Sequence, residues 1–188
     1  MKVRRLIILT LILSLFGASM VFADTVGTKI RVFVNGEETE DGGYLIDGKA
    51  YLPVGQLSSL IQGLVSWDNT DKKVTIQKPN VHMILFQEKS IFQNVTVGKY
   101  TFNVFCQIDN LRSDISSVKV TIVDPFGKST DIQEQSVTEQ KESFWFKTQD
   151  LKYDFKMKGK YTVKFFIKPA KSDDYQLVSE KVILSKED

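Results

Sequence analysis

The fold class is decided by residues 100–108, which read YTFNVFCQI. Every second residue of this run, from Tyr100 to Ile108, is apolar or aromatic, and the residues between them suit an exposed face. Alternation with a period of two is typical of a β-strand that buries one side and exposes the other. The run therefore predicts a long, half-buried strand and a fold built from sheets.

The same alternation recurs through the second half of the chain, from about Val81 to Leu184. Asp124-Pro125-Phe126-Gly127 predicts a turn between two of these segments. About seven strands are expected, over or near residues 83–86, 100–108, 118–122, 129–133, 144–146, 161–167 and 175–184. This number and spacing are typical of an antiparallel β-sandwich.

A smaller α+β module, with two hairpins and one short helix, is expected ahead of the sandwich. Residues 29–34 alternate up to the turn pair Asn35-Gly36, and a second hairpin is expected around Asp47-Gly48. After Pro53 the period changes, because Leu57, Leu60, Ile61 and Leu64 fall on one face of a helix. Gly63 suits the end of that helix. Two short strands then flank the polar loop 68–72, and the module is expected to end near Pro79.

The first 23 residues predict an export signal. Three basic residues near the start precede the apolar run Leu6–Phe16. Small residues then appear, ending in Val21-Phe22-Ala23 before Asp24, which fits a small-residue cleavage site. The alternative is an uncleaved anchor, because an apolar stretch of about 17–25 residues spans a bilayer. The expected organisation is a signal peptide (1–23), the α+β module (24–79) and the sandwich (80–188). The expected location is secreted or wall-associated, with membrane contact only through an uncleaved signal.

The α+β module resembles the N-terminal-like, or stalk, domain of copper amine oxidases. The resemblance covers roughly residues 29–77 and depends most on Leu52-Pro53 before the helix and Trp67-Asp68 followed by the strand 73–76. It implies a small module found in secreted and wall-associated proteins of Gram-positive bacteria. Members of this family often carry an arginine just after the Pro-hydrophobic pair, where this chain has Gly55. That departure weakens any expectation that the start of the helix binds an anion.

In the second half, Gly159–Val163 resembles strand F of bacterial immunoglobulin-like (Ig-like) domains, in which a tyrosine often makes a corner hydrogen bond. The residue two positions after that tyrosine is a cysteine in antibody domains and is Val163 here. The resemblance therefore implies an Ig-like sandwich of the variety that lacks the disulfide.

Charge and cysteine content exclude several classes of protein. Removing the signal removes three positive charges, so the net charge falls from +2 to −1, which argues against a nucleic-acid partner. Cys106 is the only cysteine, so no intramolecular disulfide forms. Stability must come from apolar burial, for which 42% hydrophobic residues are ample.

The reactive side chains do not suit an enzyme. A copper amine oxidase needs three histidines and a quinone cofactor in its catalytic domain, whereas this chain has one histidine, His82. A nucleophilic pair of Cys106 with His82 would need an exposed thiolate, and the alternating pattern buries Cys106. We therefore assign no catalytic, cofactor-binding or metal-binding residue, and the protein is predicted not to be an enzyme.

Three aromatic residues form the candidate contact surface. Phe105, Trp145 and Phe166 each lie between inward-facing neighbours, so each should point to the outer side of its strand. If they share one sheet face, they form an exposed patch for a glycan, a protein or another module. The alternatives are that they fill the core or pack on the first module. Lysines between 147 and 168 blunt the strand edges or attract anionic wall polymers.

The leading functional prediction is an exported, non-catalytic protein of the cell envelope that serves as a structural or binding module. Its partner would be a cell-wall polymer or another envelope protein. The alternative is a secreted inhibitor or accessory factor of an extracellular protease or hydrolase. In that alternative, the polar stretch Ser129–Ser143 would be presented as a loop.

Overall fold

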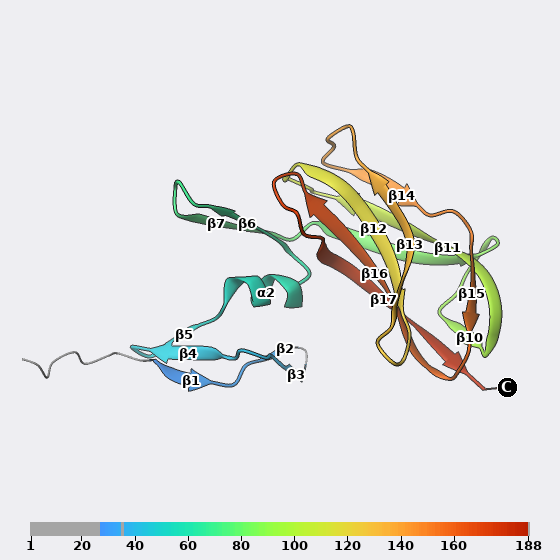
Figure 1. Ribbon diagram of the computed structural model, residues 1–188, viewed down its shortest axis with the longest axis horizontal. Helices are drawn as coiled ribbons and strands as arrows, with labels where there is room; N and C mark the ends of the chain where they lie inside the picture. Colours follow the sequence, from blue (N-terminus) through green and yellow to red (C-terminus); the bar gives the residue numbers. More distant parts are fainter. Residues whose placement is uncertain (1–26, 35, 188) are drawn as a thin grey trace, which may run out of the picture. The chain divides into compact units, whose positions relative to one another are not determined.

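The computed structural model describes residues 27–34 and 36–187, and the expected export signal lies outside them (Figure 1). The chain forms two compact units, one up to Pro53 and one from Val54 onward. The described part of the chain is mainly β, with one short helix, as the sequence predicts.

The first unit consists of a three-stranded antiparallel sheet and a short hairpin. The sheet has the order β1-β4-β5, and β2 pairs with β3. The strand bounds are Thr28–Ile30 for β1, Phe33–Val34 for β2, Glu37–Glu38 for β3, Gly43–Ile46 for β4 and Lys49–Tyr51 for β5. The turn predicted at Asp47-Gly48 is confirmed, because it joins β4 to β5 and both residues have positive φ (50° and 74°). Such a turn matches the twist of a two-residue hairpin, and glycine adopts it without strain.

Helix α2 (Val54–Leu60) follows Pro53 as predicted, but it is one turn shorter than the leucine pattern suggests. Gln62 takes a left-handed φ of 57°, and the N–H of Gly63 donates to the carbonyl of Ser58 at 2.7 Å. This is the hydrogen-bonding arrangement that closes many helices. Leu64, which the pattern placed on the helix, begins the next strand instead.

Strands β6 (Leu64–Asp68) and β7 (Lys73–Gln77) form an antiparallel hairpin around the predicted polar loop. The Asp68 carboxylate accepts the N–H groups of Thr70 and Asp71, both at 3.0 Å. A side chain that accepts backbone donors two and three residues ahead stabilises a tight reversal. The loop is therefore held by its own first residue.

Two facing sheets make up most of the second unit (Figure 1). One has the order β10-β17-β16-β12-β13, and the other has the order β14-β11-β8-β9, with β15 sharing an edge of β11 with β14. The pairs are antiparallel except β10 with β17, which is parallel. The strand bounds are β8 Asn80–Gln87, β9 Ser90–Ile91, β10 Asn94–Thr96, β11 Gly98–Asp109, β12 Ile115–Val123, β13 Ser129–Ser136, β14 Phe144–Lys147, β15 Leu151–Phe155, β16 Gly159–Pro169 and β17 Gln176–Lys186.

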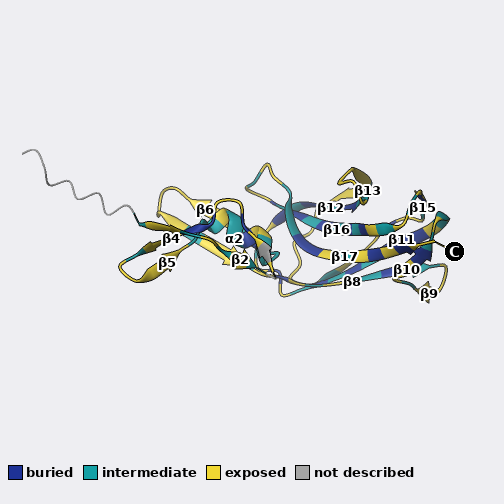
Figure 2. Cartoon of the chain, turned by 90° about the horizontal axis from the view of Figure 1, so that it is seen from below, coloured by how far each residue is buried: buried dark blue, intermediate teal, exposed yellow. Residues whose placement is uncertain are grey.

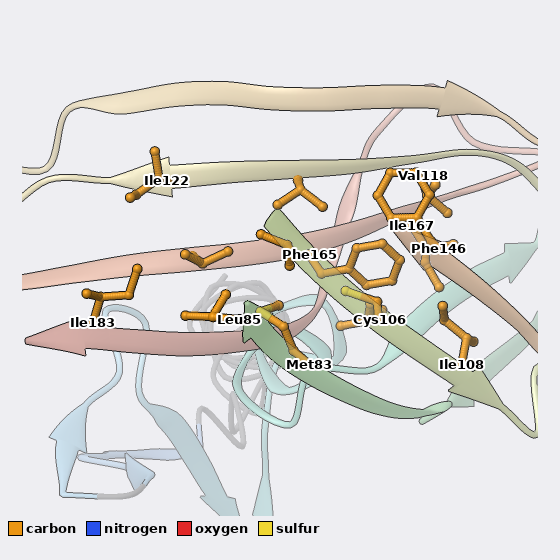
Figure 3. Packing of buried hydrophobic residues seen from close by; sticks show 14 of the residues in the cluster. Met83, Leu85, Cys106, Ile108, Val118, Ile122, Phe146, Phe165, Ile167 and Ile183 are labelled. Carbon is orange, nitrogen blue, oxygen red and sulfur yellow. The ribbon is translucent and has the colours of Figure 1, made fainter. Parts of the chain in front are cut away.

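The core lies between these two sheets, which form a β-sandwich (Figure 3). Phe146 of one sheet and Phe165 of the other have ring centroids 5.9 Å apart, and the rings of Phe155 and Tyr161 meet edge to face with centroids 4.9 Å apart. Buried and more exposed residues alternate along β16 (Figure 2) and along residues 104–109 of β11, which confirms the predicted period of two there. Burying each such aromatic or branched side chain contributes about 1.5–3 kcal/mol to stability.

Residues 54–79 belong to the same compact unit as the sandwich, although the sequence placed them in the first module. Leu64 is 3% exposed and joins the sandwich core. The carboxamide of Gln77 donates to the carbonyl of Asn110 at 2.9 Å and accepts the hydroxyl of Ser113 at 2.7 Å. The hairpin β6–β7 is thus attached to the sandwich by apolar and polar contacts. Whether 24–79 and 80–188 fold separately stays a prediction.

The predicted strands of the second half are all present, and β9, β10 and β15 are additional. The polar stretch Ser129–Ser143 is mostly not a loop, because Ser129–Ser136 forms the edge strand β13. The cause is pairing with β12 along β13, interrupted by one bulge, which outweighs the low strand propensity of its Ser, Asp and Gln residues. The loop that follows covers only residues 137–143.

Candidate functional site

The structure brings together two of the three predicted contact residues. Phe105 on β11 and Trp145 on β14 have ring centroids 6.2 Å apart, and Trp145 is 75% exposed. Phe166 lies on β16, which belongs to the other sheet of the sandwich. A single patch of three residues is therefore not formed. The role of any of them in binding stays a prediction.

Around Phe105 the outer face of its sheet carries further apolar side chains. In the sheet register, Phe105 lies opposite Ile84 of β8 and opposite Lys147 of β14. Cross-strand partners project from the same face of a sheet, so Ile84 and Phe105 lie together while Lys147 borders them. This face is a narrow apolar strip with charged and amide side chains beside it.

Phe166 instead lines a groove in the second unit. The groove has a volume of about 740 Å³, and its walls come from α2, from the hairpin β6–β7 and from the connection between β16 and β17. Ligand sites in proteins typically measure about 300–1,000 Å³. The groove is therefore large enough for a small organic ligand or part of a polymer.

The groove combines aromatic, hydroxyl and charged side chains. Trp67 is 65% exposed at its rim, and Phe166 and Tyr175 contribute two more rings. Two lysines and two aspartates line it in equal number: Lys73, Lys171, Asp68 and Asp174. Hydroxyl groups are supplied by Ser58, Ser59, Ser66, Thr75 and Ser172.

Hydrogen bonds, nearby charges and burial determine the protonation states of Asp68 and Tyr175 in the groove. The pKa of Asp68 lies below its usual value, mainly because the N–H groups of Asp71 and Thr70 donate to it and also because Lys73 and Lys171 are near. Burial raises the pKa of Tyr175, whose hydroxyl lies 2.5 Å from the Ser117 hydroxyl. At neutral pH Asp68 is therefore charged and Tyr175 is protonated.

The wall formed by β6 is held in place by Gln176. The Gln176 carboxamide accepts the N–H of Val65 at 2.7 Å and donates to the carbonyl of the same residue at 3.0 Å. A carboxamide has the same donor and acceptor as a peptide group, so Gln176 satisfies the edge of β6 as a neighbouring strand would. The groove is thus formed before any ligand arrives.

The two groups that sequence analysis considered for nucleophilic chemistry are on opposite faces of one sheet. Cys106 lies opposite Met83 and is buried, whereas His82 lies opposite Gln107, the next residue along β11, and is exposed. Burial raises the pKa of the Cys106 thiol to about 12. The pair therefore cannot act together, and the thiol stays protonated at neutral pH.

Within residues 27–34 and 36–187, no group of three or more His, Cys, Asp or Glu side chains is placed to hold a metal ion. The only histidine, His82, is exposed on β8, so the residues present do not fit a copper site. In the same residues, no helix is long and apolar enough to cross a membrane. The arrangement of the groove is suited to holding a ligand.

Sequence reasoning did not identify the groove. The sequence marks Trp67 only through the family motif and gives no signal at Lys171 or Gln176. One signal was available, because Trp67 lies between Ser66 and Asp68 in a short strand that leads into a polar loop. The approach of that strand to the connection between β16 and β17 depends on contacts between residues about 110 positions apart.

Residues 33–121 match the family model described as copper amine oxidase N-terminal domain. The expected resemblance is confirmed, and the match runs beyond the α+β module into β12 of the sandwich. It includes the groove residues of α2, β6 and β7 and ends before those of β16 and β17. The search of curated proteins found no match to the chain.

Proposed function

We propose that this protein is an exported, non-catalytic component of the cell envelope that acts as a structural or binding module. The observation that carries the proposal is the preformed groove beside Trp67, whose wall is fixed by the Gln176 carboxamide on Val65. Export is supported by the basic start, the apolar run Leu6–Phe16 and the candidate cleavage site that ends at Ala23.

The absence of catalysis in this proposal is supported by two findings. The family match is to an N-terminal domain of copper amine oxidases, and such a domain serves as a stalk. The thiol of Cys106, with a pKa of about 12, and the exposed imidazole of His82 lie on different sides of their sheet. Neither has the neighbours that a nucleophile or a general base needs.

We also infer that the sandwich is Ig-like. One sheet places β17, β16, β12 and β13 side by side, in the order of strands G, F, C and C′ of a variable-type Ig domain, and the other sheet has β8 and β11 as its inner strands. The Tyr161 hydroxyl near the start of β16 donates to the Met157 carbonyl at 3.4 Å, four residues upstream. A tyrosine at this corner with such a bond supports the assignment of β16 as strand F.

Fractionation of cells that produce the protein tests the proposal. We expect the protein to be retained in the wall or membrane fraction and to leave hydrolase activities unchanged when added to them. Release into the medium together with loss of protease or hydrolase activity on mixing would favour the secreted inhibitor instead. Retention in the cytoplasm would contradict export.

A further inference from the structure

We propose that the groove between α2, β6–β7 and the β16–β17 connection binds a neutral oligosaccharide made of pyranose rings. This inference rests on the proposed binding function and names the ligand class and the site. It is argued from the charge, the lining and the rigidity of the groove.

The first argument is charge. Lys73 and Lys171 are matched by Asp68 and Asp174, and Asp68 lies directly opposite Lys73 in the hairpin register. Cross-strand partners of opposite charge neutralise each other, and the charged side chains that line the groove sum to no net charge. A phosphate-rich chain would also meet the Asp68 carboxylate, which is charged at neutral pH. The groove therefore favours a ligand without net charge.

The second argument is the lining. A pyranose ring has an apolar C–H face and a rim of hydroxyl groups. The C–H face packs on the electron-rich face of an aromatic ring, and Trp67, 65% exposed, offers such a ring. The hydroxyl groups of the sugar need donors and acceptors, and Ser66, Thr75 and the charged side chains that line the groove supply them.

A polypeptide is the other macromolecule to consider, and the observations favour it less. Protein interfaces have desolvated apolar centres with few charges, whereas the aromatic side chains of this groove are interspersed with hydroxyl and charged groups. The β6 edge at Val65, where an added strand would pair, is already satisfied by Gln176. Binding of a peptide is therefore one of the outcomes that the test below distinguishes.

The third argument is rigidity. The Gln176 contacts and the burial of Leu64 fix β6, and the Tyr175 hydroxyl is held by Ser117 at 2.5 Å. Lys119 places its ammonium 4.4 Å from the centre of the Tyr175 ring, which holds that ring on the far wall. A fixed site loses little conformational entropy on binding, which suits a weakly held sugar.

The protein contains two tryptophans, so Trp145→Phe leaves Trp67 as the only indole in the chain. The purified Trp145→Phe protein is titrated with cellotetraose, with N-acetylglucosamine tetrasaccharide, with poly(glycerol phosphate) and with an extended octapeptide. We expect Trp67 fluorescence to change saturably with at least one neutral tetrasaccharide. The affinity should be nearly the same at 50 mM and at 500 mM salt, because no net charge is neutralised.

The matched variants are Trp67→Ala and Phe126→Ala, which removes an aromatic ring that is 79% exposed and lies outside the groove, compared by calorimetry in the otherwise unchanged protein. Trp67→Ala should weaken saccharide binding at least about tenfold, equivalent to about 1.4 kcal/mol, and Phe126→Ala should leave it unchanged. The thermal midpoint of Trp67→Ala should stay close to that of the unchanged protein, because Trp67 is largely exposed.

Three results would overturn the inference: no response to either tetrasaccharide, binding only of poly(glycerol phosphate) or of the peptide, or unchanged affinity in Trp67→Ala. The proposed envelope function fails separately. If the Trp67→Ala protein is still retained in the wall, the envelope function stands but does not depend on the groove. Binding of a soluble tetrasaccharide without any retention in the envelope supports the groove and removes the envelope role.

Discussion

Cys106 is a single side chain whose chemistry is set by its place between the sheets. It is completely buried, and desolvation raises the pKa of its thiol from 9.0 to about 12. The folded protein therefore keeps the thiol protonated over a range of pH in which the unfolded chain has already ionised. This difference links stability to pH.

We predict that Cys106 makes the protein less stable as pH rises above about 9. Below pH 9.0 the folded and unfolded states bind this proton equally, so the stabilising contribution is fully present. Between pH 9 and about 12 only the folded state retains the proton, and the free energy of unfolding falls by about 1.4 kcal/mol per pH unit. Urea unfolding at pH 7.5, 9.0 and 10.5 measures the effect.

Cys106→Ala is the control for this prediction. Other groups titrate in the same range, including Tyr153, whose pKa burial also raises. The difference in unfolding free energy between the unchanged protein and Cys106→Ala should therefore shrink from pH 9.0 to 10.5. A difference that stays constant with pH would show that the thiol does not titrate as described.

At this scale the sequence predicts which way a side chain points but not which sheet it joins. Alternation correctly placed Cys106 inside and Trp145 outside, because the period of two follows from backbone geometry alone. It could not separate Phe166 from Phe105, since the assignment of β16 to the other sheet depends on long-range pairing. The groove could not be predicted from sequence for the same reason, because its walls come from segments that are far apart in the chain.

Among the elements, the hairpin β6–β7 depends on one side chain from a distant strand. Gln176→Ala would leave both the N–H and the carbonyl of Val65 without their present partner. Leaving such groups unpaired costs about 1–3 kcal/mol when they are removed from water. We predict faster amide hydrogen exchange at Val65 and in the rest of residues 64–77, with a smaller change in the sheets of the sandwich.

Gln135→Ala, at an exposed position of β13, is the matched control and should leave exchange in the hairpin unchanged. Gln176→Glu should give an intermediate effect, because a carboxylate still accepts from the Val65 N–H but cannot donate to the carbonyl. Protection of Val65 that survives in Gln176→Ala would mean that Leu64 and the Gln77 hydrogen bonds hold the hairpin without Gln176.

Turns were the elements best predicted from sequence, and helix length was among the worst. Asp47-Gly48 and Asp124–Gly127 have turn chemistry that acts over four residues or fewer, and both form as expected. The end of α2 is set by Gln62 in a left-handed conformation and by the burial of Leu64 in the sandwich. Strand β15 carries an alternating signal at Leu151, Tyr153 and Phe155 that the count of seven strands left out.

At the scale of the whole molecule, experiments can decide where the chain divides into separately folding units. The compact units separate after Pro53, whereas the sequence predicts two modules that meet at residues 79 and 80. We predict that a fragment of residues 54–188 unfolds cooperatively at a higher temperature than a fragment of residues 80–188. The shorter fragment lacks Leu64, and loss of a buried leucine side chain costs about 2–5 kcal/mol.

Leu64→Ala within the longer fragment is the control and should account for much of the difference in melting temperature. Equal melting temperatures for the two fragments would favour the boundary at residues 79 and 80. A cooperative transition in residues 24–79 alone would support the same boundary, because it would show that the hairpin β6–β7 does not need the sandwich.

Strand β17 lies inside its sheet, between β16 and β10, although it is the last strand described. Its residues Val178 and Ile183 contribute to the core, so the interior cannot close until this segment has been synthesised. A chain that lacks β17 would therefore expose the apolar side chains of its core to solvent, instead of folding into a slightly smaller protein.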